Sequence, residues 1–198
     1  MARTYQLKKR AERQEETRRR IVEAAVAIHG EVGPAAATVS AIAERAGVER
    51  HTYYRHFPDE RSLHLACSAH FYELNPLPDP ERWRSVTDPE ARLRRALGEL
   101  YEYFADHEPL FTNVLRDLPV HPLTAEIAAL RLLPQLEAIR EALAEGLVAG
   151  RNRRRVLASL DVALSFHTWQ TLVRTGGLSK GEAAKLMARA VACTAGAE

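Results

Sequence analysis

Apolar residues recur along almost the whole chain at the spacing of an α-helix, and alternation with a period of two is nearly absent. The first clear stripe consists of Ile21, Ala24, Ala25 and Ile28, which fall on one face of a helix. Hydrophobic residues make up 46% of the 198 residues, which is enough for a packed core. The sequence therefore predicts an all-α fold of about nine helices.

Glycine and capping residues predict where the first helices begin and end. Gly33-Pro34 stops the first helix, Thr38 occupies the N-cap position of the second, and Gly47 follows its last residue. A short helix is expected over residues 50–56, and a longer one over residues 59–73. The spacing of these signals predicts four helices in the first third of the chain.

The proline-rich run at residues 75–80 is the clearest break in the sequence, because its prolines forbid a helix. We interpret it as a loop between the first four helices and the rest. Beyond it, Asp88-Pro89 predicts an N-cap followed by proline at the first helical position. One long helix is expected from Thr124 towards Gly146, a penultimate helix between Gly150 and Gly176, and a last helix opened by Ser179.

The compartment is constrained by what the sequence lacks. No run of 18 or more apolar residues occurs, and residues 1–20 are charged, which argues against a membrane span and a secretory signal. Cys67 and Cys193 lie far apart; a disulfide is possible, but reduced, buried thiols are favoured. These features favour a cytoplasmic protein.

Basic residues are concentrated in the first third of the chain. Residues 1–58 carry eleven lysines and arginines against seven glutamates, whereas residues 59–198 carry 17 basic and 19 acidic residues. A basic segment on a nearly neutral body suits an anionic partner, although a solvated charged helix would have the same composition. Charge alone does not decide between these interpretations.

The most informative segment runs from Thr38 to Phe57, with the sequence TVSAIAERAGVERHTYYRHF. Two short helices flank Ala46-Gly47-Val48, where the glycine allows the sharp turn of a helix-turn-helix. The second helix is rich in hydrogen-bond donors and aromatic hydroxyls, which suit a DNA major groove better than a protein core. The segment therefore predicts a DNA-binding element.

This segment resembles the N-terminal pattern of the Tet repressor (TetR/AcrR) family. The residues that carry the resemblance span residues 18–63 and are Arg20-Ile21, Ala24-Ala25, Ile42-Ala43, Ala46-Gly47-Val48, Tyr54, His56-Phe57 and Leu63. The resemblance implies a three-helix DNA-binding domain at residues 1–62 and a helical effector-binding and dimerisation domain at residues 63–198. It implies a transcriptional regulator, most often a repressor that binds a palindromic operator as a homodimer and is released by a small-molecule effector. Activation stays open as an alternative.

The same resemblance implies roles for individual residues. Arg50, His51 and Thr52 fall at positions that contact bases, and Tyr54 and His56 fall at positions that contact the DNA backbone. The complete predicted DNA-binding set is Thr38, Ser40, Arg50, His51, Thr52, Tyr54, Arg55, His56 and Arg61.

The chain departs from the family pattern at the start of its fourth helix. The family usually has a lysine three residues after the phenylalanine, and this chain has Glu60 there, followed by Arg61. A lysine would meet a DNA phosphate, which a glutamate repels. Either Arg61 replaces this contact or the contact is missing.

The C-terminal body carries candidates for two further surfaces. Residues 155–173 have two apolar stripes on opposite helix faces, so this helix is either buried in its own domain or shared with a partner, and sharing is favoured. The predicted dimer residues are Leu157, Leu160, Leu164, Trp169, Leu186, Met187 and Ala190. The predicted effector-binding residues are Tyr101, Phe104, His107, Phe111, Asn113, Arg116 and His167.

Signatures of catalysis and metal binding are missing from the sequence. It has no HExxH, no glycine-rich phosphate loop, no GxSxG and no clustered set of cysteine and histidine, and its eight histidines are dispersed. We therefore expect no enzyme activity, no cofactor and no metal site. A helical interaction module that has lost DNA binding is the remaining alternative, and Glu60 is the residue that keeps it open.

Overall fold

The computed structural model describes residues 2–147 and 152–196, with side chains from residue 5 onward. Within these ranges the chain is helical and contains no strand, which confirms the all-α prediction. It has eleven α-helices there instead of about nine. None of these helices combines the length and the apolar character that crossing a bilayer requires. The chain divides into two compact units, Met1–Asn75 with Pro109–Arg131, and Pro76–Glu108 with Leu132–Glu198.

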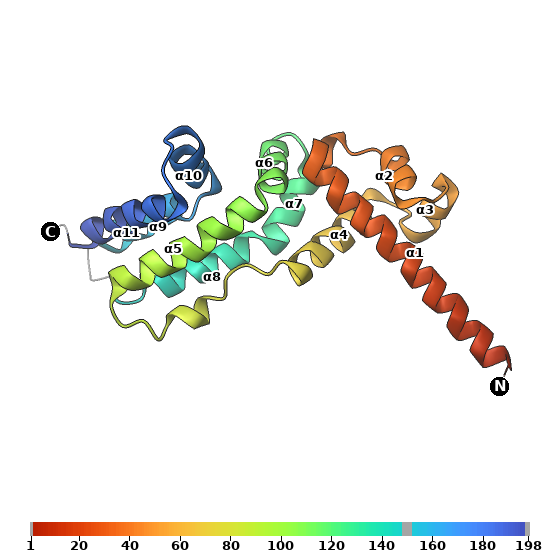
Figure 1. Ribbon diagram of the computed structural model, residues 1–198, viewed down its shortest axis with the longest axis horizontal. Helices are drawn as coiled ribbons and strands as arrows, with labels where there is room; N and C mark the ends of the chain where they lie inside the picture. The colour runs from red at the N-terminus through yellow and green to blue at the C-terminus, as the bar shows by residue number, and fades with distance from the viewer. Residues whose placement is uncertain (1, 148–151, 197–198) are drawn as a thin grey trace. The chain divides into compact units, whose positions relative to one another are not determined.

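The first unit is built around a long helix, α1. The N-terminal half of α1 extends beyond α2 and α3, while its C-terminal half packs on α2 and α4 (Figure 1). The elements of this unit are α1 (Ala2–Val32), the 3-10 turn η1 (Pro34–Ala36), α2 (Val39–Ala46), α3 (Arg50–His56), α4 (Glu60–Leu74), α6 (Glu108–Asp117) and α7 (Pro122–Arg131).

The core of the first unit lies where α1, α2, α3 and α4 meet. The predicted stripe on α1 supplies Ile21 and Ala25, both with no exposed surface, and α4 supplies Leu63. Cys67 is also buried there as a free thiol. Cys193, on α11, is exposed, so the expectation of buried thiols holds for one cysteine and is wrong for the other.

Helix α6 is bound to the C-terminal end of α1 by polar contacts. Asn113 Nδ2 donates to the carbonyl of Gly30 (2.7 Å), and Arg116 Nη2 donates to the carbonyl of Val32 (2.8 Å). The carboxylate of Asp117, only 3% exposed, accepts the backbone N–H of Ala35 (2.9 Å). These bonds satisfy backbone groups that the end of α1 and the following turn would otherwise leave open.

The second unit consists of helices that run side by side. Helix α11 packs on α5 and α9, and α8 packs on α9 (Figure 1). Trp83, Leu100, Tyr101 and Trp169 have no exposed surface and form its centre. The elements of this unit are the 3-10 turn η2 (Pro80–Trp83), α5 (Pro89–Asp106), α8 (Leu133–Ala144), α9 (Arg153–Ala163), α10 (Phe166–Gln170), a π-helical turn η4 (Thr171–Thr175) and α11 (Lys180–Gly196).

The prediction of one long helix from Thr124 towards Gly146 is wrong. The chain forms α7 and α8 instead, with the interruption at Leu132. Pro134 lies in the first turn of α8, where its ring cannot donate a backbone hydrogen bond and would clash with the carbonyl of Leu130 in a continuous helix. The break is therefore encoded by a proline that the helical periodicity obscures.

The prediction of a single penultimate helix is also wrong. Helix α9 ends at Ala163, Ser165 is extended (ψ 132°), and α10 begins at Phe166. Tyr101 Oη donates to the carbonyl of Ala163 (2.9 Å, buried), which satisfies one of the acceptors that the break leaves without a helical partner. The residues predicted as one doubly apolar helix are thus divided between α9, α10 and η4, and Trp169 is buried in the core of its own unit.

The predicted domain boundary after residue 62 falls inside α4. The compact units divide elsewhere because α4 packs on α1, and α7 packs on α4. The assignment of DNA binding to residues 1–62, and of effector binding and dimerisation to residues 63–198, concerns function and stays a prediction.

Candidate nucleic-acid interface

Helices α2 and α3 form a helix-turn-helix with the predicted signals at its ends. Thr38 Oγ1 accepts a backbone N–H of the first turn of α2 (3.2 Å) and so caps that helix. Gly47 follows α2 in the left-handed conformation, with φ 63°, as the sharp turn requires. Arg20 of α1 donates to the carbonyl of Ala46 (3.0 Å) and satisfies an acceptor at the end of α2. Helix α3 spans Arg50–His56, which is the predicted range.

Helix α3 is anchored by two aromatic side chains. Tyr53 is 3% exposed and Phe57, the residue after the helix, is fully buried in the core of the unit. The guanidinium of Arg18 on α1 lies 4.9 Å from the centre of the Phe57 ring, a cation–π contact that joins the two helices. The face of α3 that points to solvent carries Arg50, His51, Tyr54 and Arg55.

The exposed face of α3 is positively charged. Arg50 and Arg55 form no ion pair with any residue that the structure describes, so both guanidinium groups are available to an anionic partner. Burial, with the nearby charges of Arg18 and Arg55, lowers the pKa of His56. His56 is therefore neutral near pH 7 and can still donate one N–H to a phosphate.

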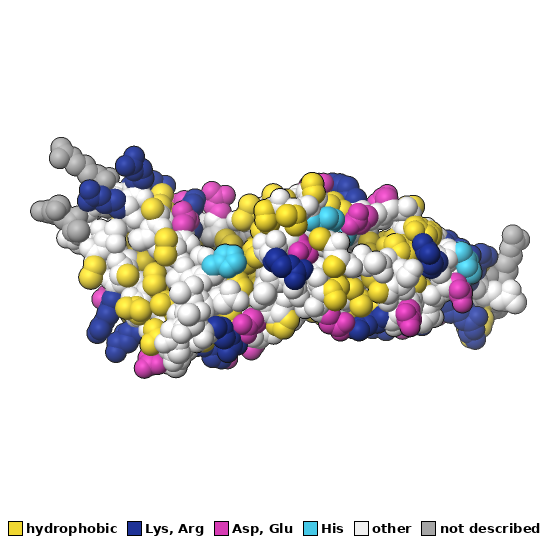
Figure 2. Space-filling view, turned by 90° about the horizontal axis from the view of Figure 1, so that it is seen from above, with side chains coloured by type: hydrophobic (Ala, Val, Ile, Leu, Met, Phe, Trp, Pro, Cys, Tyr) yellow, Lys and Arg dark blue, Asp and Glu magenta, His cyan; other side chains and the backbone are white. Residues whose placement is uncertain are grey.

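The N-terminal half of α1 adds further positive charge to the same unit. Its sequence has no apolar face, and side chains from residue 5 to residue 16 are exposed. Lys8, Lys9, Arg10 and Arg13 lie in this stretch. In Figure 2, dark-blue and cyan side chains lie close together on this unit, with magenta ones beside them. Such a distribution favours association with a polyanion.

The other predicted DNA-binding residues lie in the same unit. Ser40 is exposed in the first turn of α2, and Thr38 can donate its hydroxyl hydrogen while its oxygen caps the helix. Thr52 Oγ1 lies 3.2 Å from His51 Nε2 on the same turn of α3. Sequence reasoning assigned no role to Arg18 or to Arg20, whose contacts hold α3 and α2 on α1.

Glu60 and Arg61, where the chain departs from the family pattern, are both held by other side chains. Glu60 Oε1 lies 3.2 Å from His121 Nε2. Arg61 donates through two nitrogens to Glu126 of α7 (2.9 and 2.7 Å). An exposed ion pair of this kind contributes about 0–1 kcal/mol, so a phosphate could compete for Arg61. Its role in DNA binding stays a prediction.

The seven candidate effector residues are divided between the two units. Phe111, Asn113 and Arg116 belong to the first unit, where the last two bind the end of α1. In the second unit, Tyr101 and Phe104 fill the core with their rings 6.4 Å apart. The remaining two, His107 and His167, pack on Tyr103 and Phe166, and His167 is exposed.

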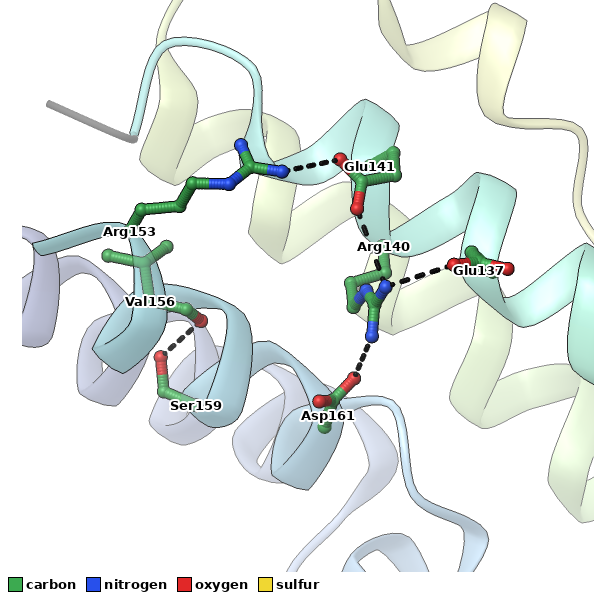
Figure 3. A network of polar contacts seen from close by, with 7 residues as sticks. All are labelled: Glu137, Arg140, Glu141, Arg153, Val156, Ser159 and Asp161. Carbon is green, nitrogen blue, oxygen red and sulfur yellow. Dashed lines mark hydrogen bonds and ion pairs between the residues drawn. The ribbon is translucent and has the colours of Figure 1, made fainter. Parts of the chain in front are cut away.

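A hollow of about 320 Å³ lies in the second unit, between α8 and the corner where α9 meets α10. On its polar side, Arg140 contacts Asp161 (3.2 Å), Glu137 (3.3 Å) and Glu141 (3.4 Å), and Arg153 extends the network to Glu141 (Figure 3). None of the seven predicted effector residues lines this hollow. Its lining residues are Leu133, Leu136, Glu137, Arg140, Asp161, Leu164 and Ser165.

The predicted dimer residues differ in their exposure. Leu160, Leu164 and Trp169 are buried within their own unit, so their side chains form its core and offer no free face to a partner. Leu157 and Met187 are half-buried. The exposed members of the predicted set are Leu186, with 48% of its surface exposed, and Ala190 one turn further along α11.

Comparison with known sequences identifies the helix-turn-helix. Residues 21–67 match the family model "Bacterial regulatory proteins, tetR family". Over 104 residues the chain is 24% identical to the uncharacterized HTH-type transcriptional regulator YerO of Bacillus subtilis (strain 168). That match covers 52% of this chain and only 36% of the relative.

Comparison with solved structures extends the similarity to the whole fold. A tetR-family transcriptional regulator from Streptomyces coelicolor aligns with a TM-score of 0.65 at 19% identity, covering 91% of this chain and 80% of that one. The TetR family transcriptional regulator PfmR from Thermus thermophilus aligns with a TM-score of 0.57 at 22% identity, covering 86% and 96%. These proteins are described as transcriptional regulators and not as enzymes, in agreement with the prediction for this chain. Residues 21–67 are therefore similar to the helix-turn-helix segment of the tetR family of bacterial regulatory proteins, and the helical fold of the chain is the one that these solved structures share.

Proposed function

We propose that this protein is a DNA-binding transcriptional repressor that binds a palindromic operator as a homodimer and is released by a small-molecule effector. The proposal of DNA binding rests on one observation, that α3 has a buried face and an exposed, positively charged face. Tyr53 and Phe57 are buried and hold the helix, while Arg50 and Arg55 are exposed without a carboxylate partner among the described residues. A short, exposed and positively charged helix suits insertion into a major groove. A regulator of chromosomal genes would act in the cytoplasm.

The assignment of base-contacting and backbone-contacting roles is tested with a pair of substitutions on α3. Arg50→Ala should weaken binding to the operator by about 1–3 kcal/mol and relax the preference at one base pair in each half-site. Tyr54→Phe removes only an exposed hydroxyl, so it should weaken binding to all sequences by about the same factor. Selection from a randomised DNA library, followed by gel shifts at two salt concentrations, measures both effects. The roles are wrong if Tyr54→Phe changes the preferred sequence and Arg50→Ala does not.

We propose that the homodimer forms through α11, together with the exposed part of α9. Leu186 and Ala190 support this proposal, because they place exposed apolar surface one helical turn apart on α11. A two-fold dimer would place its two α3 helices in half-sites separated by about one turn of DNA, roughly 34–36 Å, or more if the dimer is broad.

Leu186→Glu should convert the dimer into a monomer, since a charged side chain would be buried at the centre of the interface. Light scattering at micromolar concentration would then show a mass about half that of the unsubstituted protein. Leu74→Glu is the matched control, because Leu74 on α4 is also an exposed leucine, with 66% of its surface exposed, and lies in the other unit. A monomeric mass for the unsubstituted protein would refute the proposal.

Effector release requires a ligand whose affinity differs between the DNA-bound and the free conformations. The hollow beside α8 supports an effector site in the second unit, because three leucines and the Arg140 network combine apolar surface with a few polar groups. We therefore propose the residues that line this hollow as the effector site, in place of the effector residues predicted from the sequence.

A further inference from the structure

Three histidines that are far apart in the sequence meet in the first unit. His29 lies on α1, His64 on α4, and His121 immediately before α7. Their rings form a row, with centroids 4.9 Å apart between His29 and His64 and 5.7 Å apart between His64 and His121. The fold thus gathers residues whose dispersal in the sequence had argued against a metal site.

The buried histidines of this row carry unused nitrogen atoms. His29 and His64 are each 5% exposed, and the Nε2 atom of each is buried without a hydrogen-bond partner among the residues that the structure describes. A buried polar atom of this kind is costly unless another group binds to it. The unpartnered nitrogen of His64 is therefore an indication of a ligand.

A carboxylate completes a set of metal-ligating groups. Glu60 lies one helical turn before His64 on α4, so both side chains are on the same face. Glu60, His64 and His121 each offer one metal-ligating atom, and these three atoms lie within 4.8 Å of one another. The separation of 3.2 Å between His121 Nε2 and Glu60 Oε1 is close to the distance of about 3.3–3.5 Å between two ligands of a tetrahedral zinc ion.

Neighbouring groups orient the two imidazoles. His64 Nδ1 lies 3.0 Å from the carbonyl oxygen of Glu60, to which it can donate, so that Nε2 keeps a free lone pair. His121 Nδ1 lies 2.7 Å from Thr124 Oγ1, which leaves its Nε2 directed at Glu60.

An ion could reach these residues from solvent. The side chain of Glu60 is 58% exposed. A hollow of about 330 Å³, lined in part by His29, Glu60 and His64, opens beside them. Two imidazoles and one carboxylate form a donor set that binds zinc and related ions, with the fourth position left for water.

We propose that Glu60, His64 and His121 form a binding site for a divalent transition-metal ion of the zinc class. The ion would join the first turn of α4, which follows α3 directly, to the residue before α7. It would also reverse the local charge at Glu60, where the family pattern has a cation. The site is independent of the proposed function, because its test below uses no DNA.

The test measures Zn²⁺ binding to the full chain by calorimetry, after dialysis against a chelator. We expect one Zn²⁺ per chain and a rise in Tm of several degrees at saturation, because the assembled site exists only in the folded state. Mg²⁺ prefers oxygen ligands and should leave Tm unchanged. Glu60→Gln and His121→Gln should each weaken Zn²⁺ binding at least about tenfold.

Controls separate this site from other metal ligands. Glu60 and His121 are exposed or half-buried, so their variants should keep the unsubstituted protein's circular dichroism spectrum without metal. His70→Gln replaces another histidine of α4, and Cys193→Ser removes the exposed thiol; both should bind Zn²⁺ as the unsubstituted protein does. Equal affinity in the unsubstituted, Glu60→Gln and His121→Gln proteins would overturn the proposal. Failure of the unsubstituted protein to bind Zn²⁺ would also overturn it.

Discussion

Replacement of Phe57 by alanine is expected to lower the free energy of unfolding by about 3–5 kcal/mol. The Phe57 ring has no exposed surface, and its centroid lies 6.1 Å from that of the Tyr53 ring. The guanidinium of Arg18 on α1 lies over the Phe57 ring. Its loss leaves a cavity under the C-terminal end of α3 and removes the cation–π contact as well. Chemical denaturation followed by circular dichroism measures the change.

Tyr54→Phe is the matched control for this prediction. Tyr54 lies next to Tyr53 on α3 but has 46% of its surface exposed, so loss of its hydroxyl should change stability by less than about 0.5 kcal/mol. The two variants therefore separate folding from the proposed DNA contact: Phe57→Ala is expected to act on the first and Tyr54→Phe on the second. If Phe57→Ala leaves the denaturation midpoint unchanged, α3 is not anchored by this ring.

Gly33→Ala is expected to destabilise the first unit by about 3 kcal/mol or more. Gly33 has φ 90° and ψ 158°, a conformation that side chains other than glycine rarely adopt. A Cβ atom there would clash with Arg116 Nη2 and Asp117 Oδ2. Both side chains hold α6 on the end of α1, so their displacement would break the hydrogen bonds to Val32 and Ala35.

The control for Gly33 lies three residues earlier, in the last turn of α1. Gly30 is helical, and a Cβ atom there would meet nothing within 4 Å. Gly30→Ala should therefore stabilise the protein slightly, by about 0.5–1 kcal/mol, because alanine favours the helix. Opposite signs for the two substitutions in thermal or chemical denaturation would confirm this account. A loss of stability at Gly30 equal to that at Gly33 would contradict it.

Local chemistry explains which elements could be predicted from the sequence. Thr38 caps α2, Gly47 turns the chain, and Asp88 accepts a backbone N–H at the start of α5, all as predicted. Each of these interactions joins residues no more than a few positions apart. Helix α3 was predicted to its exact bounds for the same reason, since Gly47 and Pro58 limit it on both sides.

Contacts between distant residues explain what the sequence could not predict. The break between α9 and α10 contains neither proline nor glycine, and the hydroxyl that donates to the carbonyl of Ala163 there belongs to Tyr101, 62 positions earlier. The cluster of Glu60, His64 and His121 likewise exists only because α4 and α7 pack together. The spacing of Glu60 and His64 places both on one face of α4, but the contribution of His121 and the break after α9 require the tertiary structure.

The seven residues of α3 separate the side chains that hold the helix from those that face solvent. Tyr53 is buried, whereas Arg50, His51, Tyr54 and Arg55 contribute little to the core. Substitutions at such exposed positions usually change stability by no more than about 0.5 kcal/mol. If these residues contact DNA as we propose, the preferred DNA sequence can be redesigned, or can diverge between gene duplicates, by exchange of a few exposed residues without a compensating change in the fold.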